Sequence, residues 1–526
     1  MSKYCIGLLG FMLFQLSCKH VQEPSTTRTN ASPDALPNIV IFYVDDLGYG
    51  DLGVYGAQGV STPNVDKLAA NGVVFTDAHS TSATCTPSRY SLLTGQYAFR
   101  NNASVLPGDA PLIIDPDLET LPKMLKRSGY RTGVVGKWHL GLGNGDVDWN
   151  TTIKPGPFET GFDYSFLIPA TGDRVPSVYV ENDRVVGLSK REAPLEVNYS
   201  RKIGNLPDGI QNPELLRQPA DPEHSNTVVN GISRIGFMTG GDSAYWNDED
   251  FADVLTAKAD TFISKKAEQP FFLYFSFHDI HVPRLPHPRF QGKSTMGPRG
   301  DAIVQMDWIT GKVIESLKQK NLLENTLIIF TSDNGPVLND GYDDQAVELL
   351  GKHKPGGIYR GGKYSAFEAG TRVPTIVYWE GKAIAGVNEA LISQVDIYAS
   401  LANLTASPLQ KGEAIDSKDL SDVLLGKSNS GRSVMVEESF TLALRNKHWK
   451  FIDALPRKKG LPTFIARKGI EDGASYEMQL YNLSLDPSEQ INVAQVHPEL
   501  VKTLKSQLDS IKAVKPIVAE RVVLGN

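Results

Sequence analysis

The stretch "PNIVIFYVDDLGYGDLG", residues 37–53, decides the fold class. It opens with an apolar, β-branched run from Ile39 to Val44 and stops abruptly at Asp45 and Asp46, before a glycine-rich loop. A continuous apolar run of this length is typical of a strand that is buried on both faces of a parallel sheet. Residues that directly follow such a strand lie at the carboxyl edge of the sheet, where α/β proteins bind their ligands. The stretch therefore predicts a buried strand that ends at a functional site.

Further segments repeat this pattern of an apolar run followed by polar or charged residues. They are "RTGVVGKWHLG" (131–141), "PFFLYFSFHDIH" (270–281), "NTLIIFTSDNG" (325–335) and "RVPTIVYWEG" (372–381). Helical patterns lie between them, at 64–72, 120–130, 250–267 and 303–322. Alternating strands and helices predict an α/β fold with a large, mostly parallel central sheet and helices on both faces.

The C-terminal part of the chain has a different pattern. "SVMVEESFTLALRNKHWKFIDAL" (433–455) and "YEMQLYNLSLDP" (476–487) predict short antiparallel strands, and an amphipathic helix is expected near 497–514. We therefore predict a catalytic domain at 36–425 and a smaller C-terminal α+β subdomain at 426–526. Residues 150–245, rich in Pro, Gly, Asp and Asn, are expected to form long loops that shape a substrate pocket.

The N-terminus has the features of an export signal. A short apolar run ends in Leu16-Ser17-Cys18, which fits a secretory signal over residues 1–18 better than a membrane span. We expect a lipoprotein signal with Cys18 lipidated, or else simple cleavage, followed by a polar, flexible tether at 19–35. This predicts an exported protein in the periplasm, or an outer membrane lipoprotein, of a bacterium. The net charge of −7 lacks the basic excess of a nucleic-acid binder, so no nucleic-acid partner is expected.

The chain holds three cysteines, at positions 5, 18 and 85. Removal of the signal and lipidation of Cys18 leave Cys85 as a single thiol without a disulfide partner. An isolated cysteine is either a buried bystander or a reactive residue.

Oxygen ligands and cations gather after the predicted strands. Asp45, Asp46, Asp333 and Asn334 offer hard oxygen donors, which suit Ca²⁺ or Mg²⁺ and argue against zinc, although an aspartate pair at a strand end is often only a turn feature. The basic side chains near the same strand ends are Arg89, Lys137, His139, His278, His281 and Lys363. A divalent cation surrounded by cationic side chains describes a pocket for a tetrahedral oxyanion.

The motif "CTPSR" (85–89), followed by "LLTG" (92–95), resembles the signature of the formylglycine-dependent sulfatases. "GKWHLG", "HVP", "SDNG" and "GGKYSAFEAGTRVP" occur in the order that this family shows, and "LYNLSLDPSEQINVA" (480–494) resembles its tail. The resemblance covers residues 38 to about 380. It implies the type I, arylsulfatase-like branch of the alkaline phosphatase superfamily.

The resemblance also implies a mechanism. A maturation enzyme oxidises Cys85 to formylglycine, whose hydrated aldehyde carries two hydroxyl groups. One attacks sulfur, and the other later loses its proton and expels sulfate. Residue 85 then faces a Ca²⁺ held by the four oxygen ligands, Asp45, Asp46, Asp333 and Asn334.

Roles for the basic residues follow from the same resemblance. Arg89 orients the modified residue, and Lys137 and Lys363 bind sulfate oxygens. His139 helps to deprotonate the second hydroxyl, and His281 protonates the departing alcohol. His281 is preferred to His278 because the family's histidine lies two residues before a proline, as in "HVP".

Substrate contacts are expected in the loops beside these motifs. Thr171, in "GFDYSFLIPATGDRVP" (161–176), takes the place where relatives put a small hydroxyl or a histidine against the sulfate. His278 is either a substrate contact or a structural residue. The residues that could read sugar hydroxyls, with surface charge as the alternative, are Asp173, Arg174, His353 and Arg360.

The sequence therefore predicts a sulfuric ester hydrolase that acts on sulfated carbohydrate. One alternative is a phosphatase or phosphonate hydrolase of the same superfamily, which uses a related metal site. Another is a non-catalytic, glycan-binding lipoprotein in which Cys85 is never converted.

Overall fold

The computed structural model describes Met1 and residues 36–265, 268–460, 463, 465 and 468–515. The predicted signal, the tether and Cys18 lie outside the described residues. Leu36–Asn526 forms one compact unit, and the predicted boundary between residues 425 and 426 stays a prediction. Across the described ranges, no helix has both the length and the apolar character that a membrane crossing needs.

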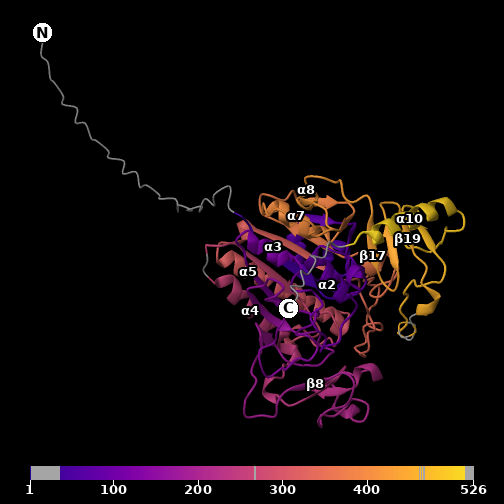
Figure 1. Ribbon diagram of the computed structural model, residues 1–526. Helices are drawn as coiled ribbons and strands as arrows, with labels where there is room; N and C mark the ends of the chain where they lie inside the picture. The colour runs from indigo at the N-terminus through magenta and orange to yellow at the C-terminus, as the bar shows by residue number, and fades with distance from the viewer. Residues whose placement is uncertain (2–35, 266–267, 461–462, 464, 466–467, 516–526) are drawn as a thin grey trace, which may run out of the picture. The chain divides into compact units, whose positions relative to one another are not determined.

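A ten-stranded sheet forms the centre of the fold (Figure 1). Its middle strands run parallel in the order β13 (Thr326–Ser332), β1 (Asn38–Val44), β12 (Phe271–Ser276), β4 (Arg131–Lys137) and β5 (Tyr164–Ile168). On one side the sheet continues through β14 (Thr375–Tyr378), β2 (Val73–Phe75) and β15 (Gly386–Asn388), and on the other through β6 (Val180–Glu181) and β7 (Arg184–Val185). The predicted α/β sheet is thus confirmed, with mixed strand directions at its flanks.

The register brings the carboxyl ends of the middle strands together. Val44 pairs with Ser332, and Tyr43 pairs with Ser276, so the polar residues after β1, β12 and β13 leave the same edge of the sheet. The expectation for "RVPTIVYWEG" is wrong in one respect: β14 runs antiparallel to β13, so its first residues, rather than its last, lie at this edge. Direction cannot be read from an apolar run alone, because parallel and antiparallel strands can be equally buried.

Helices cover both faces of the sheet. On one face, Val40, Phe42 and Val44 pack against α1 (Pro63–Ala70), α4 (Phe251–Ser264) and α5 (Gly297–Gln319). On the other face, Ile39, Ile41 and Tyr43 pack against α2 (Cys85–Thr94), α3 (Leu121–Arg127), α7 (Asp396–Leu404) and α8 (Ser421–Leu424). Alternate residues of β1 therefore supply both cores, which explains why its whole run is apolar.

Short elements complete the unit. The loop region holds the antiparallel pair of β8 (Glu196–Asn198) with β11 (Phe237–Thr239) and the hairpin of β9 (Thr227–Val229) with β10 (Ile232–Arg234). The other short elements are β3 (Ala78–His79), β16 (Ile392–Ser393), α6 (Glu368–Thr371), and the 3₁₀ helices η1 (Gly53–Tyr55), η2 (Ala98–Asn101), η3 (Pro213–Leu215), η4 (Pro222–His224), η5 (Asp242–Ala244), η6 (Asp248–Asp250), η7 (Pro288–Phe290), η8 (Leu323–Asn325) and η9 (Arg457–Lys459).

The C-terminal residues form the predicted antiparallel sheet, drawn from orange to yellow in Figure 1. Its strands are β17 (Met435–Glu438), β18 (Leu442–Arg445), β19 (Trp449–Ile452) and β20 (Gln479–Asn482), and the terminal helix is α10 (Pro498–Ala513). Leu504 and Leu508 of α10 pack on Leu444 and Phe451 of the sheet.

Strand β17 holds the chain that leads into Cys85. The Ala83 N–H donates to the Glu438 carbonyl oxygen at 2.8 Å, and the Glu438 N–H donates to the Thr81 carbonyl oxygen at 2.9 Å. The Ser439 hydroxyl donates to the carbonyl oxygen of Tyr364, whose own N–H donates to the Ala83 carbonyl oxygen at 2.7 Å. The C-terminal sheet thus supports the segment 80–84 directly.

A buried ion network lies beside these contacts. His79 Nδ1 lies 2.9 Å from Glu437 Oε1, and Lys450 Nζ lies 2.7 Å from Glu437 Oε2. Lys450 and Arg445 also lie 3.3 and 3.2 Å from Glu368 Oε1 of α6. Removal of one partner from a buried ion pair leaves an uncompensated charge. Separating the C-terminal sheet from the segments that carry His79 and Glu368 is therefore costly.

Candidate active site

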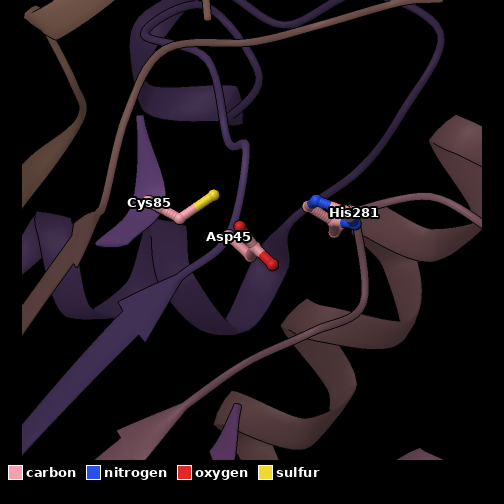
Figure 2. A group of neighbouring side chains, drawn as sticks. All are labelled: Asp45, Cys85 and His281. Carbon is pink, nitrogen blue, oxygen red and sulfur yellow. The ribbon is translucent and has the colours of Figure 1, made fainter. Parts of the chain in front are cut away.

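A cavity opens at the carboxyl edge of the middle strands. The residues that line it are Cys85, Val105, His139, Asp173, Arg174, Glu223, His224, Ile235, His281, Asp340, Lys363, Tyr364 and Lys468. Figure 2 shows the Cys85 sulfur, the Asp45 carboxylate and the His281 ring turned toward one another. One ligand atom from each of these side chains lies within 4.8 Å of the others.

The predicted oxygen ligands come together beneath this cavity. Carboxylate oxygens of Asp45, Asp46 and Asp333 lie within 4.8 Å of one another, and all three residues are buried. Asp46 adopts a left-handed conformation with φ 58°, which turns the backbone so that two consecutive side chains reach one centre. Its N–H donates to Asp333 Oδ1 at 3.3 Å.

Two of these ligands keep an oxygen atom without a hydrogen-bond partner. Asn334 Nδ2 donates to Asp46 Oδ1 at 2.7 Å, which leaves Asn334 Oδ1 buried and unpaired, and Asp45 Oδ1 is also buried and unpaired. Burial raises the pKa of Asp45 well above its ordinary value, and the nearby Asp333 and Asp46 add to this although Lys137 opposes it. Unpaired hard oxygen atoms among crowded carboxylates fit a divalent cation such as Ca²⁺.

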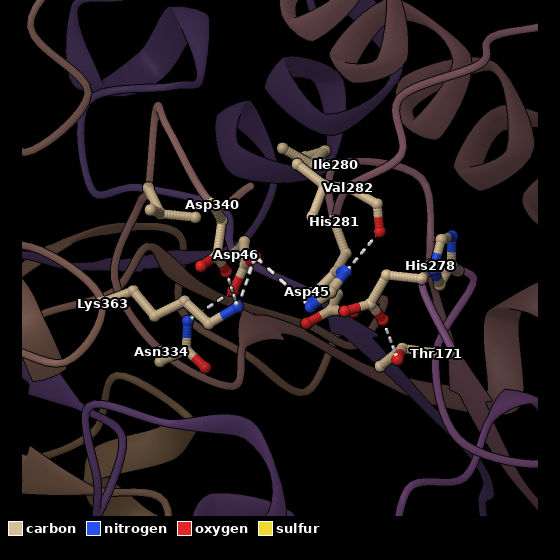
Figure 3. Close-up of polar contacts among 12 residues, drawn as sticks. Asp45, Asp46, Thr171, His278, Ile280, His281, Val282, Asn334, Asp340 and Lys363 are labelled. Carbon is tan, nitrogen blue, oxygen red and sulfur yellow. Dashed lines mark hydrogen bonds and ion pairs between the residues drawn. The ribbon is translucent and has the colours of Figure 1, made fainter. Parts of the chain in front are cut away.

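Cationic side chains surround the carboxylates. Lys137 Nζ donates to Asp45 Oδ2 at 2.6 Å. Lys363 Nζ lies between Asp46 Oδ2 at 3.0 Å and Asp340 Oδ2 at 2.9 Å (Figure 3). Arg89 donates through Nε and Nη2 to Asp333 Oδ2 at 2.9 and 2.7 Å. Arg89 therefore holds a carboxylate in place, Lys363 lines the cavity, and Lys137 is fully buried against Asp45.

Cys85 is the first residue of α2 and is 1% exposed. Burial raises the pKa of its thiol to about 12, so the unmodified side chain stays protonated. The rest of "CTPSR" fixes this helix start, because Thr86 Oγ1 donates to the His139 carbonyl oxygen at 3.0 Å and Ser88 Oγ donates to the Ser82 carbonyl oxygen at 2.9 Å.

His139 presents one unpaired nitrogen inside the cavity wall. Its Nε2 lies 2.9 Å from the Leu106 carbonyl oxygen, which only accepts, so Nε2 carries the hydrogen. Its Nδ1 is buried and has no partner. Burial, followed by the charge of Lys137, lowers the pKa of His139 well below its ordinary value, so the ring is neutral and Nδ1 can accept a proton.

The two histidines of "FHDIHVP" occupy different places. His281 lines the cavity, and its Nδ1 donates to the Val282 carbonyl oxygen at 2.6 Å, which leaves Nε2, 3.9 Å from Asp46 Oδ2, for the reaction centre (Figure 3). His278 Nε2 accepts the Gly172 N–H at 2.7 Å, and the ring is not among the cavity-lining residues. The structure therefore favours the structural alternative for His278.

The loop after β5 brings charged groups to the cavity. Asp173 and Arg174 line it, and Arg174 Nη1 lies 2.8 Å from Asp173 Oδ2. The Thr171 hydroxyl donates to Asp173 Oδ1 and accepts from Arg174 Nη1 at 2.9 Å. Thr171 is fully buried behind this pair and does not line the cavity, so a direct contact with sulfate finds no support in the geometry.

Two predicted substrate contacts lie away from the cavity. His353 Nε2 lies 2.8 Å from Asp51 Oδ1, in a buried cluster with Arg299. Arg360 forms an ion pair with Glu471 at 2.6 Å and donates to the Glu489 carbonyl oxygen at 2.7 Å. The polar atoms of His353 and Arg360 are bonded within the protein in this structure, and their expected role in reading sugar hydroxyls stays a prediction.

Sequence reasoning missed several cavity residues. These are Glu223, His224, Asp340, Tyr364 and Lys468. They come from loops and from the C-terminal part, and none follows an apolar run. Tyr364 stands next to Lys363 with φ 71°, and this proximity was the one signal in the sequence that could have pointed to it.

Comparison with known proteins agrees with this geometry. The family model described as Sulfatase matches residues 37–407. This chain belongs to the sulfatase family.

Similar sulfatases cover nearly the whole chain. N-acetylgalactosamine-6-O-sulfatase of Bacteroides thetaiotaomicron is 51% identical over 489 residues, which are 92% of this chain and 95% of that protein. Human arylsulfatase A is 31% identical over 501 residues, 91% of this chain and 88% of that one. A solved structure from a study of glycosaminoglycan metabolism by Bacteroides thetaiotaomicron superposes with a TM-score of 0.88 at 52% identity, covering 91% of this chain and 100% of that chain. The chain is thus a sulfatase, and its cavity is the place where a sulfate ester is expected to react.

Proposed function

We propose that this sulfatase removes sulfate from a sulfated carbohydrate, with residue 85 as formylglycine and with a calcium ion. Asp45, Asp46, Asp333 and Asn334 would hold the ion, which would supply positive charge to offset the negative charge that develops on oxygen atoms during the reaction. In its hydrated form, formylglycine supplies one hydroxyl that attacks sulfur and a second that allows sulfate to be released.

The observation that carries this proposal is the pair of unpaired oxygen atoms beneath Cys85. Among the described residues, Asp45 Oδ1 and Asn334 Oδ1 are buried without a hydrogen-bond partner, and Arg89 Nη2 approaches Asp45 Oδ1 only to 3.9 Å, whereas the other polar atoms of this group are almost all hydrogen-bonded. An unsatisfied buried acceptor costs about 1–3 kcal/mol, and two of them at one point support the proposal that these residues bind a cation.

The chain's own residues then handle sulfate and protons. Lys137, which is bonded to Asp45, and Lys363, which is bonded to Asp46, donate hydrogen bonds to sulfate oxygen atoms. His281 is assigned to give a proton from Nε2 to the oxygen of the departing alcohol, while Nδ1 stays bonded to the Val282 carbonyl. Burial, followed by the charges of Lys363 and Lys137, lowers the pKa of this ring, so the assignment requires the bound anionic sulfate ester to favour the protonated form. His139 takes a proton at its unpaired Nδ1 when sulfate is released. Arg89 keeps Asp333 in position throughout.

The substrate class is drawn from the cavity and from the most similar relatives. Asp173 and Arg174 stand in its wall as acceptor and donor, which suits the hydroxyl groups of a sugar. The relative at 51% identity is an N-acetylgalactosamine-6-O-sulfatase, so a 6-sulfated N-acetylgalactosamine is the first substrate to assay.

Export and maturation complete the proposal. We infer that the chain is exported by its N-terminal signal to the periplasm or the outer membrane, with a lipid on Cys18, and that a formylglycine-generating enzyme of the host converts Cys85. Fractionation of cells and mass spectrometry of the N-terminal peptide and the residue-85 peptide check these points.

The deciding experiment measures sulfate release by the purified, matured protein. We expect turnover of N-acetylgalactosamine 6-sulfate and of an aryl sulfate, much slower turnover of the matched aryl phosphate, and a mass at residue 85 that corresponds to formylglycine. A larger rate on the phosphate ester, or full activity with an unmodified thiol, contradicts the proposal.

A further inference from the structure

Lys468 reaches the catalytic cavity from the C-terminal part of the chain. It lines the cavity beside Cys85, His281 and Lys363, and it also lines an adjoining hollow together with Asp221 and Tyr342. Lys468 is therefore common to the linings of both hollows.

The contacts of Lys468 are longer than those of its neighbours. Its Nζ lies 3.5 Å from Asp340 Oδ1 and 3.6 Å from Asp221 Oδ2. The other oxygen of each carboxylate already has a closer partner: Asp340 Oδ2 lies 2.9 Å from Lys363 Nζ, and Asp221 Oδ1 lies 2.7 Å from His224 Nδ1. An ammonium group has three donors, and among the described residues Lys468 makes one long hydrogen bond, to Asp340 Oδ1 at 3.5 Å.

This side chain is nevertheless nine-tenths buried, with 10% of its side-chain surface exposed. Burying a lysine is costly unless its charge is paired at close range, so a loosely paired ammonium contributes little to folding. Its donors point to a partner that is bound in the cavity during turnover.

We propose that Lys468 is a specificity-determining residue that donates a hydrogen bond to a hydroxyl oxygen of the sulfated sugar, between Asp340 and Asp221, which accept hydroxyl hydrogens. This inference rests on the proposed carbohydrate substrate. Adjacent sugar hydroxyls each donate and accept, and the row Asp340, Lys468, Asp221 offers acceptor, donor and acceptor to match them. The two carboxylates disfavour a second anionic group here, so the ligand is a neutral diol rather than a carboxylate or another sulfate.

The test compares Lys468→Met on a sugar sulfate and on an aryl sulfate that has no hydroxyl groups. Loss of one charge-assisted hydrogen bond is expected to lower kcat/KM for the sugar sulfate about 10- to 100-fold more than for the aryl sulfate, mainly through KM. Lys468→Gln keeps a donor and is expected to fall between the wild type and Lys468→Met. Lys458→Met, at an exposed lysine of η9, is the matched control.

Deoxy analogues of the sugar sulfate locate the hydroxyl. For the analogue that lacks the contacted group, the wild type is expected to be slow and Lys468→Met to add little further loss, because the two changes remove the same bond. Equal losses on sugar and aryl sulfates, or additive losses with every deoxy analogue, overturn the role of Lys468. Absence of wild-type activity on every sugar sulfate, with aryl sulfates cleaved, overturns the proposed carbohydrate function itself.

Discussion

Replacing His281 by alanine tests which group protonates the leaving alcohol. The His281 ring faces the cavity through Nε2 and is fixed by the bond from Nδ1 to Val282. A sugar alcohol is a poor leaving group and needs this proton in the transition state, whereas a phenol of low pKa needs it far less. General acid catalysis contributes roughly 10²- to 10⁴-fold, which corresponds to about 2.7–5.4 kcal/mol of transition-state stabilisation.

We therefore expect His281→Ala to lower kcat for a sugar sulfate by about 100-fold or more, with a loss for an activated aryl sulfate at least about tenfold smaller. The assay is sulfate release across a series of aryl sulfates of rising phenol pKa, with the sugar sulfate at its end. Equal losses along the series refute the reasoning and point to sulfate binding by His281 instead.

His278→Ala is the matched comparison, because its ring contacts Gly172 rather than the cavity. Removing it frees the N–H that holds the loop of Asp173 and Arg174, so we expect a higher KM for the sugar sulfate without dependence on the leaving group. A steep leaving-group dependence in this variant assigns the acid to His278.

Three further outcomes are expected. In a host whose maturation enzyme acts only on cysteine, Cys85→Ala and Cys85→Ser abolish turnover while circular dichroism shows an intact fold, since both then prevent formation of the aldehyde; substantial activity in the alanine variant excludes a covalent role for residue 85. Chelation lowers activity and Ca²⁺ restores it better than Zn²⁺, because Asp45 Oδ1 and Asn334 Oδ1 are hard donors; tight tetrahedral zinc found by metal analysis contradicts this. Burial disfavours the charged form of the His224 ring, but Asp173 and Asp221 outweigh burial and raise the pKa of His224, so its charge is present at low pH and lost as pH rises through the raised pKa. KM for the sugar sulfate is expected to rise in that pH range. A pH profile of KM that is unchanged in His224→Gln refutes a contribution of the His224 charge to substrate binding.

The sequence predicted the parts of the site that follow buried strands. Asp45, Asp333 and Lys137 lie within or directly after strands whose apolar runs are plain, and parallel packing brings such positions to one edge. The central sheet, the helices on both of its faces and the C-terminal antiparallel sheet were predicted from the periodicity of apolar residues in the sequence and are confirmed. The antiparallel direction of β14 could not be predicted, because the pattern of apolar side chains carries no information on strand direction.

The remaining cavity residues depend on long-range folding of loops. His224, Asp340 and Lys468 lie far apart in the chain, with no strand end to mark them, and the structure alone shows that they share one wall. The contact of His353 with Asp51 was likewise not predictable, because the two residues lie far apart in the sequence.

The pairing of Glu438 with the segment 80–84 links the order of synthesis to the onset of activity. Cys85 leaves the ribosome early, but the strand that braces its loop follows only after most of the chain has been made. A chain that stops before Met435 keeps the entire "CTPSR" signature and every acidic ligand, yet its residue-85 loop lacks its partner strand. A translation product must therefore extend at least through β17 before the residue-85 loop can be braced in this way.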